Sequence, residues 1–255
     1  MRHPCTARCR GRSHGRRHLK VFFQRALLIG NSRWHWAEWN QAQWRFDHME
    51  PDHQRLGSEP LLWAAVGAIP SQLIDAPSCP RLQLQHVPLA GCPPWVGVDR
   101  ALGAWEAWRK HQHSPEPSAS GLLLADAGTV LSLTLLDGHG QFLGGQLMPG
   151  LSLQLRSMGQ RTTLLPDDVR LDQAPKDLFP AATDEAMRRG VIQSLVAAVQ
   201  DAQRSSGASL WLCGGDACLL ETELKKRGVP CRSDSTLQLQ AMVQLMDQFS
   251  PGPGR

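Results

Sequence analysis

The chain has 255 residues, of which 42% are hydrophobic and 20% charged, and its formal net charge is +4. This length suffices for one large domain or two medium ones, so the size of the hydrophobic core is not limiting. The seven cysteines at scattered spacing do not describe a disulfide framework and predict a reducing, cytoplasmic setting, and no apolar run has the length of a membrane span.

Positive charge is concentrated at the start of the chain. Residues 1–25 hold eight of the 27 basic side chains and no acidic one, whereas the rest of the chain has more acidic than basic residues. This distribution leaves no electrostatic footprint for nucleic acid on the folded part. We expect residues 1–24 to be a basic, disordered extension. A presequence, a disordered arm or an unused upstream start would each explain it. Residues 250–255 are expected to be a frayed tail.

The first folded segment predicts a strand that leads into a small-residue turn. The apolar residues 22–29 are followed by Gly30-Asn31-Ser32, and Trp34 and Trp36 then alternate with polar residues, as in a second strand. A glycine and short polar side chains suit a turn that faces a phosphate. The tryptophans are expected to belong to the core.

The next segments are less regular. Residues 41–56 are polar and are interpreted as a helix, whereas the apolar run at 61–69, stopped by Pro70, predicts a buried strand. Residues 81–87 are interpreted as another short strand.

A proline-rich loop at residues 91–95 opens onto a predicted helix with an acid in its first turn. The sequence there is Gly97-Val98-Asp99-Arg100, and apolar residues at helical spacing follow through Trp108. An aspartate in this position is most often an N-cap. The functional alternative is a general base at the end of a rigid loop, with Arg100 beside it for an anionic substrate.

Residues 121–150 predict strands arranged around a second small-residue turn. An apolar run delivers one carboxylate into Asp126-Ala127-Gly128-Thr129, a second apolar run follows at 130–136, and a turn at 137–140 leads into a returning strand at 141–148. Taken alone, the turn fits a capped strand end and a phosphate-and-cation site equally well.

The remaining chain alternates helices and strands. We expect a helix over 151–159, a loop over 167–180, and a long helix that begins at Thr183 and ends at Gly207. A short strand at 209–212 then runs into the Gly214-Gly215 turn ahead of a helix, and residues 236–249 predict a final helix.

The layout of strand and small-residue turn occurs twice, which predicts a duplicated mixed α/β unit with a cleft between its halves. The Ser/Pro-rich segment at 111–120 is the predicted boundary. The halves are expected at residues 25–115 and 116–249.

Four motifs in one order are more specific than any one of them. They are I-G-N-S at 29–32, G-V-D-R at 97–100, D-A-G-T at 126–129 and T-D-E-A at 183–186. This order resembles the type III pantothenate kinases of the acetate and sugar kinase/Hsp70/actin superfamily, over roughly residues 27–245. The resemblance implies ribonuclease H-like (actin-like) mixed-sheet halves, and a homodimer that phosphorylates pantothenate with ATP to 4'-phosphopantothenate, the first step of coenzyme A biosynthesis.

The resemblance also implies roles for individual residues. Asp99 would be the base for the pantothenate hydroxyl, and Asp126 would hold a monovalent cation, K⁺ or NH₄⁺, while Mg²⁺ accompanies ATP. Implied pantothenate contacts are Gly97, Val98, Arg100 and Thr183. Implied ATP contacts are Gly30, Asn31, Ser32, Gly128, Thr129, Gly214 and Gly215.

Two departures from the family pattern leave alternatives open. The aspartate of the first phosphate motif, which helps to organise magnesium, is replaced by Leu28, so a non-catalytic homologue that retains ligand binding is one alternative. The chain also has no tyrosine, and Trp95 stands in the loop where the family often has one. A kinase for another small hydroxylated acid is therefore a second alternative.

Overall fold

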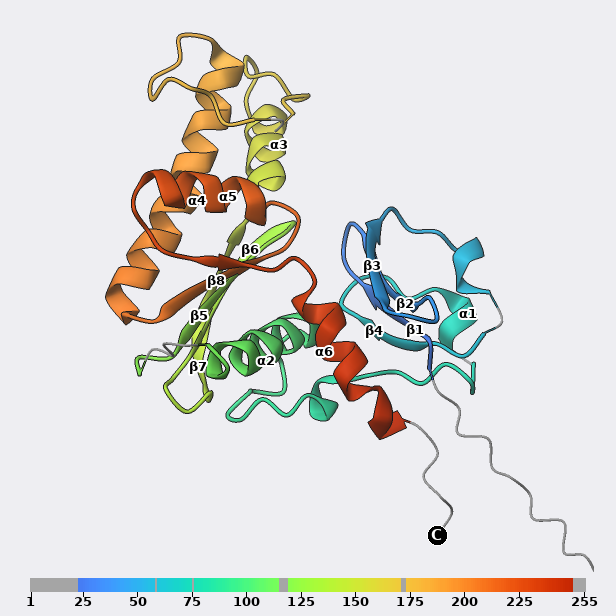
Figure 1. The fold of residues 1–255 in the computed structure, drawn as a ribbon. Helices are drawn as coiled ribbons and strands as arrows, with labels where there is room; N and C mark the ends of the chain where they lie inside the picture. The colour runs from blue at the N-terminus through green and yellow to red at the C-terminus, as the bar shows by residue number, and fades with distance from the viewer. Residues whose placement is uncertain (1–22, 58, 75, 115–118, 171–172, 250–255) are drawn as a thin grey trace, which may run out of the picture.

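The computed structural model describes residues 23–57, 59–74, 76–114, 119–170 and 173–249. The expected N-terminal extension, apart from its last two residues, and the tail at 250–255 lie outside the described residues. Two β-sheets flank a central pair of helices (Figure 1).

The N-terminal sheet has four strands in the order β3-β2-β1-β4. They are β1 (Arg25–Ile29), β2 (Trp34–Trp39), β3 (Trp44–Met49) and β4 (Leu62–Ala65). The first three strands pair antiparallel, and β4 runs parallel to β1. Leu27, Ile29, Trp34 and Trp36 are buried together on one face of this sheet, as expected for core tryptophans.

The helix expected over 41–56 is wrong, because this segment forms β3 and the 3-10 helix η1 (Gln54–Leu56). Trp44 and Phe46 are partly buried whereas Arg45 between them is exposed, which is the period of a strand. The Trp44 ring packs against Trp39 of β2, with ring centroids 5.7 Å apart. β3 is an edge strand, so polar side chains are tolerated on it and conceal its strand pattern.

The short strand expected over 81–87 is also wrong. Only Arg81 forms a β-bridge, to Trp63, and the segment then forms the 3-10 helix η2 (Leu84–His86). Prolines at 80 and 88 lack the N–H groups that a longer ladder needs. A one-turn helix, α1 (Ser71–Ile74), precedes this segment.

The C-terminal sheet repeats the arrangement of the first sheet. Its order is β7-β6-β5-β8-β9, from β5 (Leu122–Ala127), β6 (Val130–Leu136), β7 (Phe142–Pro149), β8 (Ser209–Cys213) and β9 (Arg232–Ser233). β5, β6 and β7 pair antiparallel and β8 is parallel to β5, as β4 is to β1. The duplicated mixed-sheet architecture is therefore confirmed, although the division into domains at residue 115 stays a prediction.

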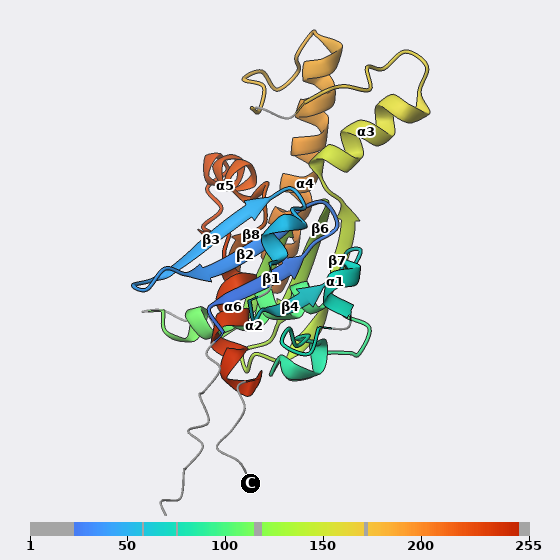
Figure 2. The same cartoon turned by 90° about the vertical axis from the view of Figure 1, so that its right-hand side faces the viewer.

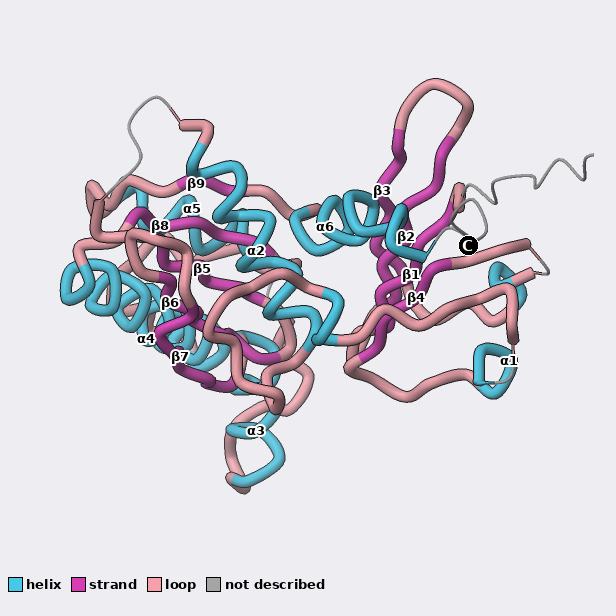
Figure 3. Tube along the Cα trace, turned by 90° about the horizontal axis from the view of Figure 1, so that it is seen from below, coloured by secondary structure: helices cyan, strands magenta, loops and turns pink. Residues whose placement is uncertain are grey.

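Two helices connect the sheets. α2 (Val98–Gln112) packs on β5 and β6, while α6 (Leu237–Leu245) packs on β1 and β2 and on α2 (Figure 3). One buried apolar cluster takes residues from both sheets and from both helices. The final helix predicted at 236–249 is α6, which ends at Leu245 and is followed by the 3-10 helix η3 (Met246–Phe249).

The outer face of the C-terminal sheet is covered by α3 (Leu151–Arg161), α4 (Thr183–Ser206) and α5 (Ala217–Lys226). α4 begins at Thr183 and ends at Gly207, whose φ of 63° is left-handed, as expected. Its 24 residues span about 36 Å, so its first turns project beyond the sheet together with α3 (Figure 2). Among the described residues, no helix combines the length and apolar character of a membrane span.

Candidate active site

The two predicted phosphate turns meet in the structure. The Ser32 and Thr129 hydroxyls form a hydrogen bond with 2.8 Å between their oxygens, although the residues are 97 positions apart. Each turn follows the first strand of its sheet, β1 or β5, so the duplicated topology brings them face to face. Asn31 and Ser32 are exposed there.

Each turn is also packed against a second glycine. A Cβ on Gly67 would lie 2.1 Å from the Gly30 carbonyl oxygen, and a Cβ on Gly150 would lie 2.1 Å from that of Gly128. Any larger residue would push the turns out of place. Sequence reasoning noted Gly150 as part of the Gly-rich stretch but missed Gly67.

Asp99 and Asp126 interact in the same region. Asp99 lies in the first turn of α2 and accepts a 2.8 Å hydrogen bond from the Arg100 backbone N–H. The pKa of Asp126 is raised to about 6, chiefly by burial and to a smaller extent by the negative charge of Asp99. Burial also raises the pKa of Asp99, and this effect outweighs the hydrogen bond and the positive charge of Arg100. The two carboxylates are therefore near enough for the charge of Asp99 to act on Asp126.

Asp126 has two neighbours that sequence reasoning did not connect with it. The Gln238 side chain of α6 donates a 2.9 Å hydrogen bond to Asp126 Oδ2, from 112 positions along the chain. Gly214, with φ of 90°, would place a Cβ 2.6 Å from Asp126 Oδ1. Gly214 therefore lets the backbone approach this carboxylate, and no local sequence signal marks Gln238.

Arg100 extends from α2 toward the C-terminal sheet. Its guanidinium donates to the Thr134 hydroxyl through Nη2 at 3.2 Å and Nε at 3.4 Å. A Cβ on Gly145 would lie 2.7 Å from Arg100 Nη2, so this glycine leaves space for the guanidinium. These contacts hold the positively charged guanidinium of Arg100 in place, one residue after Asp99.

Arg33 links the first turn to the glycine turn that follows β8. A Cβ on Gly215 would lie 3.5 Å from Arg33 Nη1. Burial raises the pKa of Asp216, and the positive charge of Arg33 opposes that rise. The turns at 30–32, 126–129 and 214–215 therefore converge, and Arg33 is a site residue that sequence reasoning missed.

The other predicted positions differ in their surroundings. Gly97 is needed beside Asp99, because a Cβ on it would lie 2.5 Å from Asp99 Oδ1. Val98 is buried in the shared core and offers only its backbone to a ligand. Leu28 is 4% exposed and packs in the same core, whereas Trp95 is 83% exposed.

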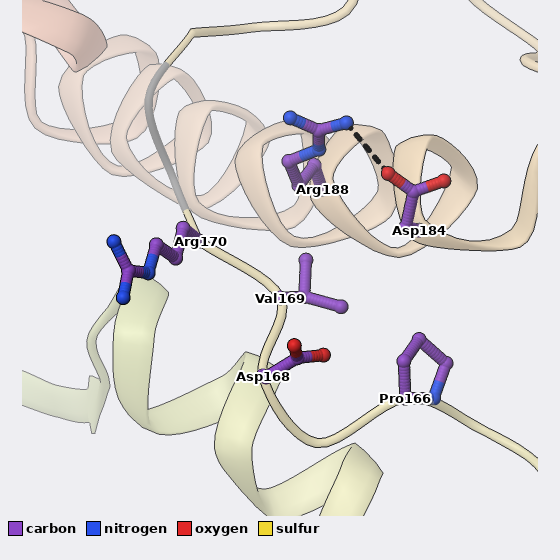
Figure 4. A pocket seen from close by; sticks show the side chains of 6 residues that line it. All are labelled: Pro166, Asp168, Val169, Arg170, Asp184 and Arg188. Atoms are coloured by element: carbon purple, nitrogen blue, oxygen red, sulfur yellow. Dashed lines mark hydrogen bonds and ion pairs between the residues drawn. The ribbon is translucent and has the colours of Figure 1, made fainter.

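Thr183 lies apart from this centre within one chain. It begins α4 at the projecting end, well away from α2 (Figure 1). Beside this end is an open pocket of about 400 Å³, in which Arg188 pairs with Asp184 at 2.8 Å (Figure 4). The lining residues are Pro166, Asp168, Val169, Arg170, Asp184 and Arg188.

The residues present fit a cation held by a single carboxylate, that of Asp126. In the described part of the chain, no group of three or more His, Cys, Asp or Glu side chains is placed to hold a metal. Asp126 offers one buried carboxylate whose charge a cation would neutralise. Mg²⁺ usually takes most of its ligands from water and phosphates, so it can enter with a nucleotide.

The fold is shared with solved structures of low sequence identity. A Baf family protein from Campylobacter jejuni aligns with a TM-score of 0.63 and 16% identity, over 88% of this chain and 98% of its own. The activator of 2-hydroxyisocaproyl-CoA dehydratase from Clostridium difficile, with bound ADPNP, aligns with a TM-score of 0.50 and 12% identity, over 89% and 95%. These likenesses concern the fold alone, and with the duplicated sheets they define an actin-like α/β protein.

Sequence comparison identifies the family. Residues 83–205 match the family described as type III pantothenate kinase. A type III pantothenate kinase from Synechococcus elongatus is 34% identical over 194 residues, which are 68% of this chain and 74% of that relative. One from Synechococcus sp. strain JA-3-3Ab is 32% identical over 232 residues, covering 86% and 90%. This chain belongs to the type III pantothenate kinase family, and is a kinase.

Proposed function

We propose that this protein transfers the γ-phosphoryl group of ATP to the primary hydroxyl of pantothenate, giving 4'-phosphopantothenate and ADP for coenzyme A synthesis. Family membership supports the substrates. The observation that carries the proposal is the Asp99–Asp126 pair with two phosphate-type turns joined by Ser32 and Thr129. Phosphoryl transfer needs chiefly positioning and charge neutralisation, which such a centre supplies.

ATP binding is assigned to the three converging turns. The backbone and short side chains at residues 30–32 and 128–129 are suited to phosphate oxygens, and Arg33 adds positive charge between the first turn and Gly215. Gly214 and Gly215 would lie against the nucleoside. Bound Mg²⁺ supplies neutralisation of the phosphate charge.

Asp99 is assigned as the general base. It accepts the hydroxyl proton of pantothenate while the hydroxyl oxygen bonds to the γ-phosphorus, and the bond from that phosphorus to the leaving ADP oxygen breaks. Burial raises the pKa of Asp99, and a raised pKa strengthens a carboxylate as a base. Gly97, Val98 and Arg100 lie beside it, and the fixed Arg100 guanidinium suits the pantothenate carboxylate.

Asp126 is assigned to a monovalent cation, K⁺ or NH₄⁺. Burial and the Asp99 charge disfavour its ionised form, and a bound cation would reverse this effect. The cation supplies positive charge beside the transferring phosphoryl group.

We further propose a homodimer in which Thr183 of one subunit completes the pantothenate site of the other. The projecting start of α4 would reach a neighbouring subunit more readily than its own Asp99 (Figure 2). Exposed apolar side chains accompany this projection, including Leu164 at 91% and Phe179 at 89% exposure, and such surfaces are typical of interfaces. Residues 25–115 and 116–249 would be the two domains of each subunit.

The test is formation of phosphopantothenate by the purified protein with ATP, Mg²⁺ and saturating pantothenate, with K⁺ or choline as the monovalent cation. We expect turnover that K⁺ stimulates. Absence of turnover in both buffers would refute the proposal.

A non-catalytic homologue is the second candidate, and the burial of Leu28 at the first phosphate motif favours it. Complementation of a strain that lacks pantothenate kinase separates the two candidates. Growth would exclude the non-catalytic homologue, whereas failure to grow, together with measurable nucleotide binding, would support it.

A further inference from the structure

The first predicted phosphate turn has the apolar Leu28 near the end of β1 and a histidine pair on the two neighbouring strands. In the register of the N-terminal sheet, Leu28 of β1 lies opposite His35 of β2, and His35 lies opposite His48 of β3. Directly opposed residues of antiparallel strands point to the same face, so these three side chains form one row. The row lies on the face of Leu28, which packs with the core shared with α2 and α6.

The two imidazoles hold one another in place. Their Nδ1 atoms are 2.7 Å apart, and the rings meet edge to face with centroids 4.9 Å apart. Burial, then His48 and Arg33, lower the pKa of His35 to about 4, while burial and Arg33 lower the pKa of His48 against the opposing charge of Asp47. Both rings are therefore neutral at pH 7, and one Nδ1–H donates to the other Nδ1.

The other nitrogen of His35 faces the turn. A Cβ built on Gly30 would lie 3.2 Å from His35 Nε2, so this atom lies against the Gly30 backbone. If His48 Nδ1–H is the donor of the pair, His35 Nδ1 accepts and His35 Nε2 carries the proton. An N–H group then points at the turn to which the phosphates are assigned, with Arg33 nearby as a source of positive charge.

We infer that His35, oriented by His48, donates a hydrogen bond from Nε2 to a phosphate oxygen of the nucleotide at the Gly30–Ser32 turn, and so contributes the polar contact that Leu28 cannot make. The inference rests on the proposed function, because it requires ATP at this turn. It differs from the role of a carboxylate, which acts on the phosphates through a cation. His35 acts on the phosphate directly, and His48 is a positioning residue.

The experiment compares variants at both histidines. His35→Leu removes the donor, whereas His35→Gln places an amide N–H near the position of Nε2 and is expected to restore binding. His48→Phe leaves His35 without its orienting partner. His53→Leu is the matched control, because His53 belongs to the same half but packs on Trp34, with ring centroids 5.1 Å apart.

Two readouts are taken for each variant, namely the KM values for ATP and pantothenate, and the Kd of a non-hydrolysable ATP analogue with and without Mg²⁺. A hydrogen bond to a charged group is worth about 10-fold to 100-fold in affinity. We expect His35→Leu to raise the KM for ATP and the Kd of the analogue by roughly tenfold or more. The KM for pantothenate should stay unchanged in His35→Leu. The Kd of the analogue should stay close to the wild-type value in His35→Gln. A double variant with His35→Leu and His48→Phe should bind the analogue no more weakly than His35→Leu alone.

Each other outcome overturns the inference in a recognisable way. An unchanged Kd in His35→Leu overturns it, and so does an equal loss in the His53→Leu control. A loss seen only with Mg²⁺ would assign His35 to the cation instead. If His35→Leu does not fold, His48→Phe decides: a raised Kd of the analogue supports the inference, and an unchanged Kd overturns it. If the wild type binds the analogue but shows no turnover, the proposed function is refuted and the variants still test His35. If the wild type shows neither binding nor turnover, the proposed function and the inference about His35 are both overturned.

Discussion

Replacing Asp126 with asparagine should stabilise the protein in the absence of K⁺, because it removes a buried charge. Asparagine keeps the shape of the side chain, and its carbonyl can still accept the Gln238 hydrogen bond. The pKa of Asp126 is raised from 3.8 to about 6 in the folded state. A shift of this size corresponds to roughly 3 kcal/mol against folding when the carboxylate is ionised.

Because the pKa of Asp126 is raised and not lowered on folding, the direction of the pH dependence is determined. Between about pH 4 and pH 6 the folded state binds more protons at Asp126 than the unfolded state, so the wild-type free energy of unfolding falls as the pH rises through this window. At pH 8 the full penalty applies and Asp126→Asn should be the more stable protein. For a domain of this length the gain corresponds to roughly 6–12 °C in Tm, and it should shrink as the pH is lowered toward 5.

Thermal unfolding at pH 5 to 8, in choline and in K⁺ buffers, measures this effect. K⁺ should raise the Tm of the wild type and leave Asp126→Asn unchanged. Asp137→Asn is the control, because hydrogen bonds from the Gln141 and His139 backbones lower the pKa of this exposed carboxylate and its loss should not stabilise. An Asp126→Asn protein that is less stable than the wild type at pH 8 in choline would refute the reasoning.

Three further predictions concern the chemistry. Asp99→Asn should lower kcat by about 10²-fold to 10⁴-fold while the Kd of an ATP analogue stays the same, measured by steady-state kinetics and calorimetry. In choline buffer, the acid limb of the kcat/KM profile should reflect protonation of Asp126, with activity lost as the pH falls through about 6. The Asp126 pKa measured by NMR should fall in Asp99→Asn, because a negative neighbour is removed. Thr134→Val removes the hydroxyl that holds Arg100 and should raise the KM for pantothenate about threefold to tenfold with little change in the KM for ATP; an unchanged KM for pantothenate would count against the role of Arg100.

The strands and turns of the fold follow from local sequence patterns. Apolar runs that end in small residues marked β1 at Gly30 and β5 at Gly128, and the repetition of this pattern predicted the duplicated halves. β3 was missed because an edge strand buries only part of its surface, so polar residues dominate the composition of residues 41–56. Trp44, Arg45 and Phe46 alternate as in a strand, but the alternation does not continue to Met49.

The contacts that assemble the site are of another kind. Ser32 and Thr129 are 97 positions apart, and Gln238 and Asp126 are 112 positions apart. Such pairs depend on how two sheets and two helices dock, which no local period encodes. The histidine pair depends likewise on the register of β3, an element that the sequence did not predict.

The most direct test of this account is phosphopantothenate formation by the wild type and Asp99→Asn, measured side by side with ATP, Mg²⁺, K⁺ and saturating pantothenate. We expect turnover by the wild type and loss of at least about 99% of kcat in the variant, with analogue binding retained. Wild-type turnover that survives in Asp99→Asn, or no turnover by the wild type, would contradict it.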